Sequence, residues 1–252
     1  MEQKLIKPIV KVGNGAGVLL PKKWLNGKAK IELVEKPLDI NSDVLRLLSN
    51  YLNDILGIYI VGSYARGEQT KDSDVDVLAI TSGSNKKIKN GKYEIILISK
   101  EEVEKQLEKN AIPLLPMLKE ARVLINENLI EEYKKVKLTD KNLKWHIETT
   151  KSAMKMIEKL NEASKEIGEE SSEGVTYSLI LRLRTLYTID CIKKNKQATR
   201  EGLLKLIKKI TGGLDAYEIY VNIKNEEDTK KTLPLEKSEK LREYILNEVK
   251  KL

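Results

Sequence analysis

A chain of 252 residues with 40% hydrophobic and 33% charged residues has a globular composition, which excludes a disordered protein. No apolar run approaches the roughly 20 residues of a membrane span and no signal segment follows the N-terminus, so we expect a soluble protein of the cytoplasm. One cysteine excludes an intrachain disulfide, one histidine excludes a histidine-rich zinc site, and the net charge of +8 suits either a polyanionic partner or simply a lysine- and glutamate-rich surface.

The first segment, residues 1–37, has the pattern of a small β-rich module. Lys7–Lys11 and Gly17–Leu20 predict two short strands, because the glycines between them permit the tight turn of a hairpin. Pro21 suits the first position of a helical turn. Ala29–Glu35 alternates between apolar and polar residues, which predicts a further strand.

Residues 38–138 mix helical and strand patterns. Ser42 is a suitable N-cap for a helix that runs through Leu56. Short apolar runs bounded by turn residues then predict strands, and a helix lies between the last two. The strands are Ile58–Val61, Val75–Ile80, Tyr93–Ile98 and an edge strand Ala121–Ile125, and the helix is Lys100–Lys109.

Residues 139–252 carry apolar residues at helical spacing throughout, with breaks at glycines and a proline. This pattern predicts four or five antiparallel helices. The sequence therefore predicts an α+β protein of three domains: a small N-terminal β module at 1–37, a mixed sheet with flanking helices at 38–138, and an all-α bundle at 139–252.

The segment from Gly62 to Asp76 carries the most specific chemistry. Gly62 follows a strand and lets the backbone approach a phosphate, while Ser63 adds a hydroxyl donor. Asp74 and Asp76 stand two residues apart at the start of the next strand, so both side chains leave the same face. Two carboxylates beside a phosphate loop predict a magnesium site, since this ion favours one or two carboxylates together with phosphate oxygens and water.

These residues form a recognisable signature. The order Gly62-Ser63, Ala65-Arg66-Gly67 and Ser73-Asp74-Val75-Asp76 resembles the polymerase-β-like nucleotidyltransferase superfamily, and most of all its minimal prokaryotic members. The resemblance implies that the glycine and serine bind the nucleotide phosphates. It also implies that the two aspartates are catalytic metal ligands.

Two more residues enter through this resemblance. Family members carry a third carboxylate on a neighbouring strand, which binds metal and deprotonates the acceptor, and Glu94 is the best match, although most members have aspartate there. A solvent-facing glutamate on an edge strand is the alternative. Arg66 would bind triphosphate, or else form a salt bridge with Asp72 or Glu68.

The resemblance implies a reaction. A nucleoside triphosphate, ATP first, would bind with two Mg²⁺ ions, and an NMP group would move to an acceptor hydroxyl. A protein hydroxyl is the first expectation for this acceptor, with a small aminoglycoside-like molecule or an RNA end as the other candidates.

The flanking segments show weaker resemblances. Lys11–Lys22, followed by Trp24 and Ala29–Leu33, resembles the AbrB-like swapped-hairpin fold, which implies a homodimer and DNA contacts through residues 1–37. The helical segment resembles the HEPN-type bundles that minimal nucleotidyltransferases carry. An alternative function follows: an AbrB-like DNA-binding regulator in which the transferase domain only senses nucleotide.

Overall fold

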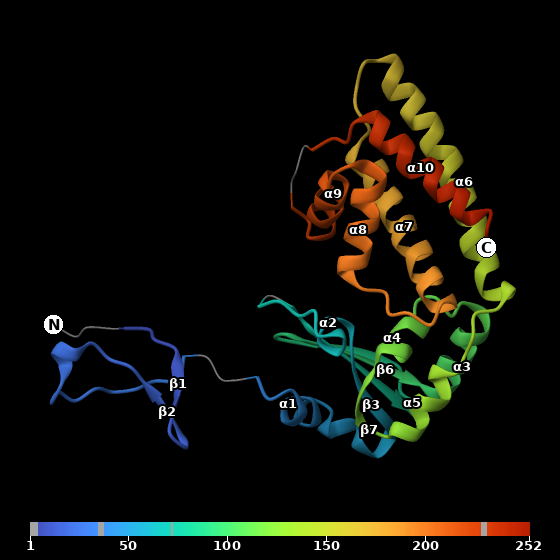
Figure 1. The fold of residues 1–252 in the computed structure, drawn as a ribbon. Helices are drawn as coiled ribbons and strands as arrows, with labels where there is room; N and C mark the ends of the chain where they lie inside the picture. The colour runs from blue at the N-terminus through green and yellow to red at the C-terminus, as the bar shows by residue number, and fades with distance from the viewer. Residues whose placement is uncertain (1–4, 35–37, 72, 228–230) are drawn as a thin grey trace. The chain divides into compact units, whose positions relative to one another are not determined.

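The computed structural model describes residues 5–34, 38–71, 73–227 and 231–252 (Figure 1). The chain divides into two compact units, Met1–Asp39 and Ile40–Leu252. The second unit contains both the predicted transferase region and the predicted bundle. Their separation into domains 38–138 and 139–252 stays a prediction.

The N-terminal unit is a hairpin with an irregular extension. Strands β1 (Ile9–Val12) and β2 (Gly15–Val18) pair antiparallel, and the short 3₁₀ helix η1 (Lys22–Trp24) follows. The predicted strand Ala29–Glu35 is wrong over residues 29–34, which form no strand, and Glu35 lies outside the described residues. A strand needs a hydrogen-bonding partner, and none of the described residues pairs with this segment.

A mixed five-stranded sheet forms the centre of the second unit, which confirms the predicted α+β class. The strand order is β5-β6-β4-β3-β7, with β4 and β6 parallel and the other neighbours antiparallel. The strands are β3 (Ile55–Val61), β4 (Val75–Thr81), β5 (Lys86–Asn90), β6 (Tyr93–Ser99) and β7 (Arg122–Ile125).

Alternate residues of the sheet build two cores. Val75 and Val77 of β4 pack with Val44 of helix α1 (Ile40–Leu47). Leu78 and Ile80 pack on the opposite face, against α3 (Lys100–Lys109), α4 (Leu115–Glu120) and α5 (Glu127–Lys134). This two-residue periodicity puts Asp76 on the face of α3, α4 and α5.

Two features of this region differ from the prediction. The helix expected from Ser42 to Leu56 ends at Leu47, continues as the 3₁₀ helix η2 (Ser49–Asp54), and gives way to β3 at Ile55. The β-branched residues of β3, which are Ile55, Ile58, Ile60 and Val61, favour an extended chain over further helical turns. Strand β5 is missing from the predicted strands, because its lysines interrupt the alternation of apolar and polar residues that marks a strand. Exposed lysines are typical of an edge strand.

Five helices, within the expected range, form the bundle in the described part of residues 139–252. They are α6 (Asp140–Glu166), α7 (Glu173–Lys193), α8 (Arg200–Thr211), α9 (Asp215–Lys224) and α10 (Leu235–Val249). Local signals set their ends: Thr139 forms a capping box at α6, Thr199 caps α8, and Gly212 ends α8 in the left-handed conformation. No helix in the described part of the chain is both long and apolar enough to cross a membrane.

The bundle and the sheet region share apolar contacts. Ile112 follows α3, and it packs with Leu143 of α6 and Ile189 of α7. Figure 1 shows the end of α7 and the start of α8 above α4, so the bundle stands over the face of the sheet that α3, α4 and α5 cover. The bundle therefore faces the same side on which Asp76 lies.

Candidate active site

The short helix α2 (Gly62–Arg66) begins where β3 ends. Gly62 has a φ of 68°, which favours glycine, and a Cβ there would collide with the carboxylate of Asp76. The glycine thus lets the backbone of α2 touch the acidic side chain of the next strand. Ser63 is the next residue of α2, and its hydroxyl makes no hydrogen bond with any described residue.

The sheet register aligns the predicted carboxylates. Asp76 is paired with Val61 on β3 and with Glu94 on β6, and Glu94 is paired in turn with Lys89 on β5. Directly opposite residues of neighbouring strands point to the same face, so Asp76 and Glu94 lie side by side. Asp74 precedes β4 by one residue, is exposed, and acts electrostatically on Asp76.

Asp76 lies in a negative environment. Burial raises the pKa of its carboxyl above the ordinary value, and the charges of Glu94 and Asp74 raise it further, while Arg66 lowers it. Glu94 lies 2.7 Å from the ammonium of Lys89, and its side chain is 45% exposed. Glu94 is thus partly exposed, but β6 lies between β5 and β4, so the edge-strand alternative does not describe its position.

Whether these residues suit a divalent cation follows from their charge and number. Among the described residues, no three Asp, Glu, His or Cys side chains are grouped so as to hold a metal ion by themselves. Magnesium needs only one or two carboxylates beside phosphate oxygens and water. The half-buried Asp76, with two like charges acting on it, fits such an ion, which would offset the repulsion.

An unpredicted carboxylate holds both ends of α2. Glu120, the last residue of α4, accepts a 2.7 Å hydrogen bond from the backbone N–H of Gly62 through Oε1. Its Oε2 accepts a 2.7 Å bond from Arg66, so one side chain holds both groups expected to bind phosphate. The sequence carries no signal for Glu120, because 58 residues separate it from Gly62.

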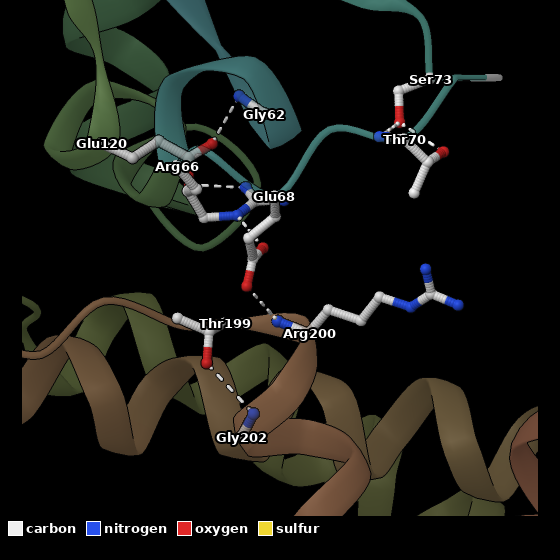
Figure 2. Close-up of polar contacts among 9 residues, drawn as sticks. All are labelled: Gly62, Arg66, Glu68, Thr70, Ser73, Glu120, Thr199, Arg200 and Gly202. Carbon is white, nitrogen blue, oxygen red and sulfur yellow. Dashed lines mark hydrogen bonds and ion pairs between the residues drawn. The ribbon is translucent and has the colours of Figure 1, made fainter.

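Arg66 also donates through Nε to Glu68, at 2.7 Å, as the salt-bridge alternative expected; Asp72 lies outside the described residues. The other oxygen of Glu68 accepts a 3.0 Å bond from the backbone N–H of Arg200. Figure 2 shows Glu68 between α2 and the start of α8. These hydrogen bonds connect α2 to the helical bundle.

A cavity of about 1150 Å³ lies between the sheet region and the bundle. Arg66, Ser73 and Glu120 line it on one side, and residues of α7, α8 and α9 line it on the other. Asp74, Asp76 and Glu94 do not line this cleft. Two residues that do line it lie next to them: Ser73 directly precedes Asp74, and Arg66 acts electrostatically on Asp76.

Known proteins resemble the chain as follows. A family model described as a nucleotidyltransferase domain matches residues 43–247. A nucleotidyltransferase-like protein from Exiguobacterium sibiricum is similar in structure, with 13% identity, a TM-score of 0.40, and coverage of 84% of this chain and 75% of that one. Spectinomycin adenyltransferase from Enterococcus faecialis, solved with ATP and spectinomycin, shows 16% identity, a TM-score of 0.43, and coverage of 83% and 97%. No curated protein matches the chain in sequence.

Proposed function

The chain belongs to the nucleotidyltransferase family, and we propose that it moves an NMP group, AMP from ATP, to an acceptor hydroxyl in the cytoplasm. The observation that carries this proposal is the alignment of Asp76 and Glu94 on one sheet face, directly beside the glycine at which α2 begins. Carboxylates that suit a metal ion and backbone N–H groups that suit a phosphate therefore lie next to each other.

We assign the roles as follows. Gly62 and Ser63 bind the phosphates through the first turn of α2, and Arg66 offsets their charge. Asp74 and Asp76 would hold Mg²⁺, with Glu94 as the third carboxylate once its side chain moves, and the ion would supply charge neutralisation and align the attacking and leaving oxygens. To join the site, Glu94 exchanges its bond with Lys89 for the ion or for the acceptor proton.

Substrate binding has to rearrange one contact. Glu120 accepts from the same N–H of Gly62 that a phosphate would use. Two anions at one donor repel each other, so the carboxylate turns aside when a phosphate arrives. Until then it keeps α2 in place through Arg66.

Mass spectrometry tests the proposed reaction. We expect the protein, with Mg²⁺ and ATP, to release pyrophosphate and add the mass of AMP to an acceptor, and we expect a chelator to stop both. Parallel reactions with the four triphosphates identify the preferred nucleotide. A protein that binds no nucleotide and releases no pyrophosphate with any acceptor would refute the proposal.

We further propose that the AbrB-like segment, residues 1–37, joins two copies of the chain. None of its described side chains is buried, and Ile6, Leu19 and Ile31 are 82%, 71% and 70% exposed. Apolar residues this exposed mark an interaction surface. The DNA-binding regulator is the alternative, since Lys7, Lys11 and their neighbours could meet phosphates.

Removal of residues 1–37 separates these possibilities. We expect the truncated chain to keep nucleotide transfer, because Ile40–Leu252 is a compact unit of its own, and to shift from dimer to monomer in light scattering. Salt-dependent DNA binding by the full chain that disappears on truncation, together with unchanged mass, would favour the regulator instead.

We also propose that the HEPN-like bundle recognises the acceptor. Its helices α7, α8 and α9 supply one wall of the cleft beside the carboxylates. A protein hydroxyl, a small molecule and an RNA end are the three candidates, and the chemistry of the cleft distinguishes among them.

A further inference from the structure

The cleft between sheet and bundle is strongly basic. Among the described residues that line it, seven are lysine or arginine and one, Glu120, is acidic. Like charges repel across an interface and complementary ones attract. A polycationic aminosugar is therefore a poor ligand for this cleft, whereas a molecule that carries several phosphates is a good one.

Several of these cations have no ion-pair partner among the described residues. Lys134 is paired with Glu131, and Lys119 donates to the backbone oxygen of Lys134. Lys196, in the segment that joins α7 to α8, and Arg200, the first residue of α8, are by contrast exposed. Neither side chain forms an ion pair with a described residue. Cations left without a protein partner are available to an anionic ligand.

Tyrosines stand among these cations. Tyr217 and Tyr220 of α9 line the cleft, with ring centroids 5.9 Å apart. The ring of Tyr220 is only 4% exposed and stacks on Tyr177, so the half-buried ring of Tyr217 is the one of this pair that a base could reach. The guanidinium of Arg200 lies 5.8 Å from the centre of the Tyr217 ring, and that of Arg184 donates to the Tyr220 hydroxyl at 3.1 Å. A basic groove interleaved with aromatic rings is the signature of single-stranded nucleic acid binding, where phosphates meet the cations and bases stack on the rings.

One nucleotide does not account for the whole surface. The cavity of about 1150 Å³ exceeds the range of about 300–1000 Å³ that is typical of small-ligand sites. Its cations come from six different helices or their ends, so they extend well beyond α2 and Arg66. A triphosphate at that loop leaves the cations of α7, α8 and α9 to a second anionic molecule.

We propose that the acceptor is the 3′ end of a single-stranded nucleic acid, held in this cleft; the inference rests on the proposed nucleotidyl transfer. The strand's terminal hydroxyl oxygen bonds to the α-phosphorus of ATP, and the bond from that phosphorus to the bridging oxygen breaks. Pyrophosphate leaves with the bonding electrons, and the hydroxyl proton passes to Glu94. The product is the strand extended by one AMP through a phosphodiester.

The test uses the full chain and a fluorescent RNA of about 10 nucleotides, a length within the range of single-strand sites. The Lys196→Glu, Arg200→Glu double variant should weaken RNA affinity, measured by anisotropy, about tenfold or more. It should also reduce the slope of log affinity against log salt by about 1.4, because two phosphate contacts are lost at about 0.7 each for a single strand. A merely structural defect would leave that slope unchanged.

A matched double variant controls for net charge. Lys155→Glu with Lys159→Glu makes the same charge change on the exposed surface of α6, outside the cleft, and should leave affinity and slope unchanged. In transfer reactions with labelled ATP, we expect the RNA to gain one nucleotide. The same reaction with DNA of the same sequence tests whether the protein requires the 2′-hydroxyl of RNA.

Three results separate failure of the inference from failure of the proposed function. AMP transfer to an aminosugar or a protein, with the RNA unmodified, would overturn the inference and keep the transferase. Loss of ATP binding alone in the cleft variant would also overturn it. RNA binding that depends on the cleft without any transfer would support the cleft assignment and overturn the proposed reaction.

Discussion

Asp76→Asn is expected to lower nucleotide transfer by about 100-fold or more while raising the melting temperature. The substitution keeps the shape of the side chain but removes the charge that would hold a divalent cation against the triphosphate, a type of electrostatic loss that costs about 10²–10³ in rate. Transfer rates with labelled ATP measure the first effect. Thermal unfolding without nucleotide or metal measures the second.

The gain in stability follows from the raised pKa of Asp76. A carboxyl whose pKa is higher in the folded state binds protons more readily when folded, so its contribution to stability is largest below the unfolded pKa. That contribution is lost as pH rises from the ordinary value of 3.8 through the raised one. The variant should therefore gain most at neutral pH and lose its advantage in acid.

A second aspartate provides a control of opposite sign. The pKa of Asp215 is lowered, first of all by its bond with Lys237, so ionised Asp215 stabilises the fold above its unfolded pKa. Asp215→Asn should lower the melting temperature at neutral pH and leave transfer unchanged, because this residue lies in the bundle and does not line the cleft. Equal shifts in the two variants would contradict the electrostatic account of Asp76.

The local part of this site was predictable from sequence. Gly62, Asp74 and Asp76 lie within 15 residues, and the two-residue period of a strand predicted both aspartates on one face. Strand β4 begins at Val75, so Asp76 lies on the strand and Asp74 precedes it. The match of Glu94 came from the family resemblance, and the register of β6 against β4 now brings it beside Asp76. Which ions and substrates these residues bind stays a prediction.

The long-range part was not predictable. Glu120 contacts Gly62 across 58 residues, and Glu68 contacts Arg200 across 132. The sequence around an acidic residue at a helix end does not show whether its side chain faces solvent or accepts a hydrogen bond from a distant backbone N–H group. The basic cleft was hidden for a similar reason: its lysines and arginines come from separate helices, in a chain where both charge types are spread evenly.

Gly62→Ala is expected to lower both stability and transfer, and its two costs can be separated. An alanine at φ near 68° loses about 1–2 kcal/mol because an L-residue is strained in the left-handed region. The added methyl also collides with the Asp76 carboxylate, which must shift. A displacement of about 1 Å at a reacting site can cost about 100-fold in rate, and we expect a loss of that size.

Gly168→Ala isolates the strain from the collision. Gly168 has a φ of 72°, almost that of Gly62, and a methyl there meets no atom within 4 Å. It lies after α6 and does not line the cleft, so this variant should lose about the same strain energy and keep full transfer activity. Denaturant unfolding and kcat/KM measured side by side then assign the excess loss in Gly62→Ala to the displaced carboxylate. If the two alanine variants transfer AMP equally well, close approach of α2 to Asp76 is not needed for the reaction, and the site assignment is wrong.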